Sequence, residues 1–147
     1  MKIKELGHVV LYVSNLEKSV KFYRDTLGFA QIASFGTQGA IFSSGRTHHE
    51  LLLLEVGGQP KVHGEIKPGL YHIGFKIGDS PEDIKQAYYE LKEKSVPIIG
   101  TADHTVTHSI YILDPDGNEL ELYADVSNVW RQNPGAVAAP VKPLNLD

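Results

Sequence analysis

The feature that most constrains the fold is a weak internal repeat. The two halves of the chain correspond at an offset of 64, so that His8 falls on His72, Leu11 on Phe75 and Asn15 on Asp79. Each half shows the same order of patterns: a short apolar run, a helix start, and three further apolar runs separated by turn residues. Because one such unit does not bury its own sheet, the two halves are expected to pack as a single domain.

These patterns predict the same elements in each half. In the first half we expect strands over 8–13, 29–34, 40–44 and 49–56, and a helix from a Ser14–Glu17 capping box to Gly28. In the second half we expect strands over 71–77, 96–101, 109–113 and 119–123, and a helix that begins at Ser80-Pro81. The fold class is therefore α+β, with paired βαβββ units at about 5–57 and 69–124. One domain would span 1–125, and 126–147 would form an irregular tail.

Composition excludes several classes of function. The chain of 147 residues carries a net charge of −4 without a basic run, which argues against a nucleic-acid surface. The absence of cysteine excludes a disulfide framework, a thiolate metal site and a cysteine nucleophile. No apolar run is long enough to cross a membrane, and the N-terminus shows no secretory signal. A cytoplasmic protein is expected.

Three residues suggest a metal site. His8 and His72 open the first strand of each half, and positions related by a pseudo-twofold axis converge in space. In the last strand, alternation places Glu121 on the face opposite Leu120 and Leu122. Two histidines and one carboxylate form a ligand set that leaves open positions on the metal and is typical of non-haem Fe(II) oxygen chemistry.

Four segments in this order carry a resemblance to a known family: GHVVLYVSNLEKSVKFYRDTLGF (7–29), HHELLLLEV (48–56), GLYHIGFKI (69–77) and HSIYILDPDGNELELY (108–123). Together they resemble the vicinal oxygen chelate superfamily, which includes glyoxalase I, extradiol catechol dioxygenases, fosfomycin-resistance transferases and bleomycin-resistance proteins. The resemblance covers residues 5 to about 125. It implies a mixed sheet curled around a divalent metal held by His8, His72 and Glu121.

Within the superfamily, three further positions resemble extradiol dioxygenases. His49 matches a residue that handles protons, Tyr111 matches a tyrosine that faces the substrate, and His104 matches the histidine of a DHGVS motif. Thr105 departs from that motif, which leaves open whether His104 or His108 fills the role. This resemblance implies an Fe(II)-dependent enzyme, with Mn(II) as the other metal, acting on a small aromatic catechol and O2. His48, His63 and His108 are otherwise expected at the surface.

Other functions remain open on the same scaffold. The position where glyoxalase I has an extra carboxylate is Leu52 or Leu53, which argues against that enzyme. The second possibility is a Mn(II)-dependent fosfomycin-type thiol transferase, or another lyase or isomerase of the superfamily. Against the transferase, the sequence shows no obvious basic pocket for a phosphonate, because Arg24, Arg46 and Arg131 are scattered along the chain. A non-enzymatic binding protein is the third. A homodimer is expected, with the tail around Trp130 as an apolar anchor, because a single module leaves sheet edges open.

Overall fold

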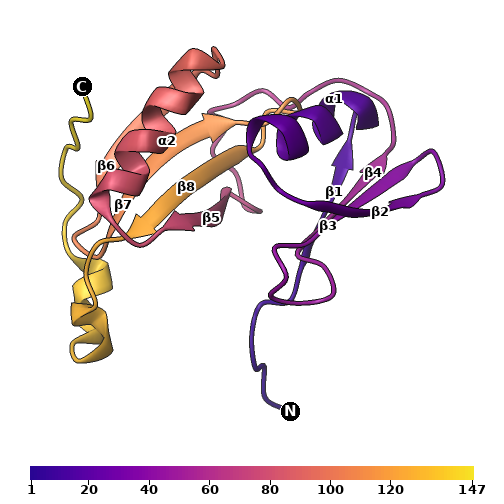
Figure 1. Ribbon diagram of the computed structural model, residues 1–147. Helices are drawn as coiled ribbons and strands as arrows, with labels where there is room; N and C mark the ends of the chain where they lie inside the picture. Colours follow the sequence, from indigo (N-terminus) through magenta and orange to yellow (C-terminus); the bar gives the residue numbers. More distant parts are fainter. The chain divides into compact units, whose positions relative to one another are not determined.

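The computed structural model describes residues 1–147, which divide into two compact units, Met1–Val62 and His63–Asp147. Each unit contains one mixed four-stranded sheet with a helix on one face (Figure 1). The predicted α+β class with two βαβββ units is therefore confirmed. No helix has the length and apolar character needed to span a lipid bilayer.

The first unit contains a mixed sheet in the order β1-β4-β3-β2, with β1 parallel to β4 and the other pairs antiparallel. Its elements are β1 (Val9–Val13), α1 (Leu16–Val20), a π-helical turn (Lys21–Thr26), β2 (Gln31–Phe35), β3 (Gly39–Phe42) and β4 (Leu51–Glu55). The helix-side core contains Leu11, Val13, Leu51 and Leu53, all buried. The alternation expected for 8–13 is thus present, because Val10 and Tyr12 face away from this core.

The second unit repeats this topology in the order β5-β8-β7-β6, again with one parallel pair, β5 and β8. Its elements are β5 (His72–Gly78), α2 (Pro81–Glu93), β6 (Ile98–Asp103), β7 (Thr107–Leu113) and β8 (Glu119–Asp125). Helix α2 lies across one face of the sheet (Figure 1), where Ile84 and Leu91 are buried with Leu120 and Leu122. This packing leaves the odd-numbered residues of β8 on the opposite face.

The expected turn at 114–118 joins β7 to β8. Buried Asp114 accepts hydrogen bonds from the backbone N–H groups of Asp116, at 2.9 Å, and Asn118, at 2.8 Å. The side-chain amide of Asn118 donates a third bond to Asp114, at 2.8 Å. The turn therefore fixes where β8 begins.

The helix starts differ from prediction in the residue that caps α1 and in the offset between the two caps. The side chain of Asn15, not Ser14, caps α1, accepting a bond from Lys18 N–H at 2.9 Å. The cap of α2 is Ser80, as expected, so the caps are 65 residues apart although the preceding strands correspond at 64. The reason is a register shift in β5 between Lys76 and Gly78, which adds one residue before the helix.

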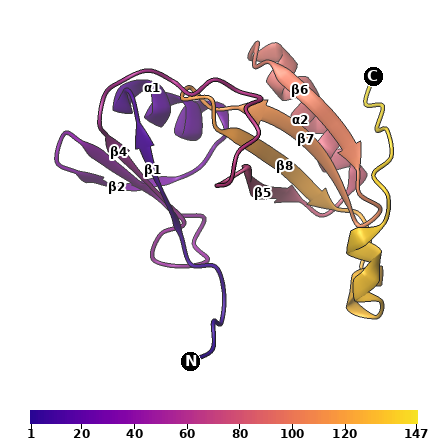
Figure 2. The same ribbon diagram turned by 180° about the vertical axis from the view of Figure 1, so that it is seen from behind.

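The C-terminal tail forms two 3-10 turns, Val129–Arg131 and Pro134–Ala138, and then returns along β6 (Figure 2). Lys142 and Asp103 exchange backbone hydrogen bonds at 2.9 and 3.0 Å, and the Thr101 hydroxyl donates to the Leu144 carbonyl at 2.8 Å. The tail is therefore attached to the second unit.

Candidate functional site

Glu121 is the centre of a polar cluster in the second unit. Its side chain leaves β8 on the face opposite α2, as alternation predicted, and is only 16% exposed. The strand register places it between Gly74 on β5 and Tyr111 on β7. Neighbouring strands therefore bring functional groups to both sides of this carboxylate.

One oxygen of Glu121 is held by hydroxyl groups. The Ser109 hydroxyl donates to Oε1 at 2.6 Å, and the Tyr111 hydroxyl donates to the same atom at 3.1 Å. The Tyr111 oxygen also lies 2.8 Å from His104 Nε2. Because the single Tyr111 proton is directed at Glu121, His104 serves as the donor in this second bond. These contacts form a hydrogen-bonded chain from His104 through Tyr111 to Glu121.

Tyr111 remains protonated within this hydrogen-bonded series of side chains. Burial raises the pKa of Tyr111 far above its ordinary value of 10.0, and the negative charge and hydrogen bond of Glu121 raise that pKa further. The Tyr111 hydroxyl is therefore a hydrogen-bond donor at neutral pH.

The other oxygen of Glu121 faces His72. Glu121 Oε2 and His72 Nε2 are 3.1 Å apart. Two ligands bound at about 2.0–2.2 Å on adjacent positions of one metal ion are separated by about 3 Å. The pair therefore fits a divalent metal, with Oε2 and Nε2 as the ligand atoms.

A second carboxylate lies behind His72. Glu119 is 8% exposed, and its Oε1 is 3.9 Å from His72 Nδ1, a buried atom without a hydrogen-bond partner. Its Oε2 is 2.8 Å from His63 Nε2. A hydrogen bond to Glu119, together with that carboxylate's charge, raises the pKa of Tyr71. Metal-binding histidines commonly direct their second ring nitrogen at a carboxylate, so this placement also favours Nε2 of His72 as the ligand atom.

The first unit has a cluster of three histidines, His8, His48 and His49. One potential ligand atom from each lies within 4.8 Å of the others. The cluster forms because parallel pairing of β1 with β4 brings Val9 N–H to Glu50 C=O at 2.9 Å, just beside His8 and His49. Burial lowers the pKa of His49, and the charges of His8 and His48 lower it further.

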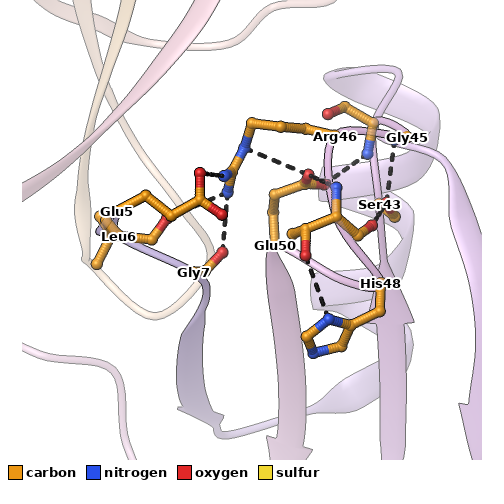
Figure 3. Close-up of polar contacts among 10 residues, drawn as sticks. Glu5, Leu6, Gly7, Ser43, Gly45, Arg46, His48 and Glu50 are labelled. Carbon is orange, nitrogen blue, oxygen red and sulfur yellow. Dashed lines mark hydrogen bonds and ion pairs between the residues drawn. The ribbon is translucent and has the colours of Figure 1, made fainter. Parts of the chain in front are cut away.

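Glu50 and Arg46 fix the loop that carries His48 and His49 (Figure 3). The Glu50 carboxylate accepts bonds from Ser44 N–H at 2.6 Å and from Thr47 N–H at 3.1 Å. Arg46 Nε is 3.6 Å from that carboxylate, and its Nη2 donates to the Gly7 carbonyl at 2.9 Å. The loop is thereby attached to the segment that contains His8.

The structure thus brings the candidate residues together within each unit. His72, Glu121, Tyr111 and His104 meet in the second unit, and His8 and His49 meet in the first. His108 lies 3.8 Å from Asp103, so His104 is the histidine that contacts Tyr111.

Four residues of these clusters escaped prediction: His48, His63, Ser109 and Glu119. Glu119 could have been predicted from the sequence, because alternation along 119–123 puts it on the same face as Glu121. His63 was not, since it lies 56 residues away in the chain from its partner Glu119.

With this geometry in place, comparison with known proteins identifies the class. Residues 5–122 match the profile of the Glyoxalase/Bleomycin resistance protein/Dioxygenase superfamily. The chain belongs to this superfamily, whose members bind divalent metals.

Two kinds of enzyme are similar in sequence. The chain is 40% identical over 123 residues to metallothiol transferase FosB of Staphylococcus epidermidis, covering 82% of this chain and 84% of the relative. It is 34% identical over 130 residues to catechol-2,3-dioxygenase of Bacillus subtilis, covering 87% of this chain but 44% of the relative. The chain therefore spans less than half the length of that dioxygenase.

Solved structures support the fold. A glyoxalase/dioxygenase from Nostoc punctiforme superposes with a TM-score of 0.68 at 21% identity, covering 84% of this chain and 92% of the other. Lactoylglutathione lyase from Agrobacterium tumefaciens superposes with a TM-score of 0.63 at 21% identity, covering 84% and 96%.

Proposed function

We propose that this protein is a metal-dependent dioxygenase that cleaves a catechol-type ring, with His8, His72 and Glu121 as metal ligands. The observation that carries the proposal is the hydrogen-bonded chain from His104 through Tyr111 to Glu121. Ring cleavage needs a proton donor and a proton acceptor beside the metal ligands, and this series of hydrogen-bonded side chains supplies both.

When bound, a divalent ion would supply Lewis-acid activation, and Fe(II) would add the redox chemistry that O2 requires. The roles of the protein groups follow from their protonation. Tyr111 keeps its proton, which it donates to Glu121 and can redirect to a substrate oxygen. His104 can hold or move a proton at Nε2, the atom that contacts the Tyr111 hydroxyl. His49, whose pKa is lowered, is available as a neutral base.

The decisive experiment is anaerobic loading with Fe(II), followed by addition of O2 and a series of catechols. Ring fission would be recorded as stoichiometric O2 consumption together with coloured ring-opened products. A fully iron-loaded protein that consumes no O2 with any catechol would contradict the proposal.

The second candidate is a Mn(II)-dependent thiol transferase. It is favoured by the 40% identity to FosB, which matches this chain over 84% of its length. The charges around the site argue against an anionic phosphonate substrate, because the groups that contact Glu121 and Glu119 are hydroxyls and imidazoles. Lys76 is held by Asp125, and Arg46 by Glu50. Mn(II)-loaded protein should be assayed for thiol addition to fosfomycin, and turnover there without catechol cleavage would select this function.

A non-enzymatic binding protein is the third candidate, and it predicts ligand binding that is independent of metal. We further propose that the protein is a homodimer and that it is cytoplasmic. The dimer is supported by the edge strands β1, β2 and β5, to which no further strand is paired, whereas the tail partly covers β6. Sedimentation at micromolar concentration tests the dimer, and a monomer would contradict it.

A further inference from the structure

The second unit contains a cleft of about 290 Å³ beside Glu121. One wall is β8, which contributes Glu121, Tyr123 and Asp125. The C-terminal tail also lines the cleft, with Trp130 from the first 3-10 turn and Val137 from the second. The cleft is therefore made by a segment outside the repeated βαβββ unit.

This cleft shares Glu121 with the candidate active site. Glu121, Tyr123 and Asp125 alternate along β8 and so lie on one face of the sheet. Glu121 is also the residue that contacts Tyr111 and His72. A molecule in the cleft would therefore lie against the carboxylate at which the polar cluster converges.

The lining has a distinct chemical character. Trp130, Val137 and Val106 offer apolar surface, and Tyr123 adds an aromatic ring. The two charged lining residues, Glu121 and Asp125, are both acidic, and Lys76 forms an ion pair with Asp125 at 2.6 Å. Glu121 is a proposed metal ligand and Asp125 is paired with Lys76, so neither carboxylate gives the cleft a free negative charge. None of the lining residues is a cation that could pair with an anion. The lining therefore accepts an uncharged aromatic group, whereas a charged substituent would be desolvated there without a partner. The volume lies at the small end of ligand pockets, about 300–1,000 Å³, and suits a single substituted ring.

We propose that this cleft binds the uncharged apolar ring substituent of the substrate, with Trp130 and Val137 as specificity-determining contacts. The inference rests on the proposed function for the identity of the ring, and it adds the selection of apolar over anionic substituents.

Trp130 is the only tryptophan in the chain, so its fluorescence reports directly on the cleft. The metal-loaded protein should be titrated without oxygen with 4-tert-butylcatechol, 4-methylcatechol and 3,4-dihydroxybenzoate. We expect saturable quenching, with the tert-butyl compound bound about tenfold more tightly than the methyl compound and the carboxylate more weakly than both. Equal affinities for the three probes would overturn the proposal.

Two valines of the tail provide a matched pair of variants. Val137, which lines the cleft, is 61% exposed, and Val141, which does not, is 60% exposed. Val137→Asp should weaken binding of 4-tert-butylcatechol about tenfold, whereas Val141→Asp should leave it within about twofold. The same small effect in both variants would show that the ring binds elsewhere.

Oxygen consumption separates this inference from the proposed function. Quenching that depends on Val137, without O2 consumption, would keep the cleft as a binding site and contradict ring cleavage. O2 consumption that is unchanged by Val137→Asp for every probe would keep ring cleavage and contradict the role of the cleft.

Discussion

The two units share a topology but differ at one decisive position. In the first unit Val10 pairs with Leu52, and in the second the corresponding Gly74 pairs with Glu121. The residue equivalent to the candidate ligand Glu121 is therefore Leu52, which has no ligand atom. The extra carboxylate expected of a glyoxalase I site, its fourth ligand, is thus absent at this position.

The residues two places before Leu52 and Glu121 are both glutamates, Glu50 and Glu119, but their contacts differ. Glu50 precedes β4 and fixes a loop through Ser44 and Thr47, whereas Glu119 begins β8 and contacts His63 and His72. The same acidic position is structural in one unit and lies behind a candidate ligand in the other. The repeat therefore preserves the strands and the first histidine, while the carboxylate chemistry is concentrated in the second unit.

The largest expected effect tests whether the metal site depends on the second unit. Removing a ligand costs far more than removing a supporting residue, for which the loss is about 10–100-fold. His72→Ala or Glu121→Gln should abolish stoichiometric metal binding, while His48→Ala and His49→Ala should retain it. Metal content after desalting and chelator competition provide the measurement. Equal metal content in wild type and His72→Ala would place the site elsewhere.

The role of His8 can be tested by mixing variants. His8→Ala and His72→Ala should each lack tightly bound metal. If two chains share each site, equal amounts of the two variants unfolded and refolded together should regain about a quarter of one equivalent per site, because about half of the dimers are mixed and each mixed dimer restores one of its two sites. If each chain supplies its own three ligands, the mixture should remain empty.

The next largest effect concerns the hydrogen bonds that link His104 through Tyr111 to Glu121. Tyr111→Phe or His104→Ala should lower kcat by about 10²–10⁴-fold with metal retained, as expected for proton-transfer groups. KM should change less than kcat, since these groups act mainly in the transition state. His108→Ala is the matched control, because His108 faces Asp103 and should keep near-normal turnover. Similar losses for His104 and His108 would contradict this assignment.

A smaller effect compares the carboxylates that order the connections before β4 and β8. Asp114→Ala removes the acceptor of three hydrogen bonds in a buried turn and should destabilise the protein by about 2–4 kcal/mol. Glu50→Ala should cost about 1–2 kcal/mol, because water reaches its more exposed loop. Urea unfolding measures both free energies, and a larger loss for Glu50 would reverse the comparison.

The smallest effect is the pH dependence of the Glu50 contribution. Burial alone would raise the pKa of Glu50, but hydrogen bonds from Ser44, Thr47 and Ser43 outweigh it and lower that pKa from its ordinary value of 4.5. The ionised carboxylate therefore stabilises the folded state above about pH 4.5, and this stabilisation is lost as the pH falls through the lowered pKa. The stability difference between wild type and Glu50→Gln should shrink on acidification. A constant difference between pH 7 and pH 3.5 would contradict this linkage.

Local patterns in the sequence determined the faces of the strands, one turn and one helix cap of this protein. Alternation alone placed Glu121 opposite Leu120 and Leu122, because successive side chains of a strand point to opposite faces. The turn at 114–118 and the cap at Ser80 were also predictable, since each depends on a few adjacent residues. The repeat predicted two similar units and the equivalence of His8 with His72.

The tertiary structure decided what depends on distant partners. The one-residue shift in β5 arises from strand pairing, so the caps do not follow the offset of the strands. The choice of His104 over His108 follows from how β6 and β7 pair, and the contact of His63 with Glu119 joins residues far apart in the chain. The cleft at Trp130 likewise exists only because the tail folds back beside β8. Such contacts depend on register and packing, which a periodic pattern in a single segment does not encode.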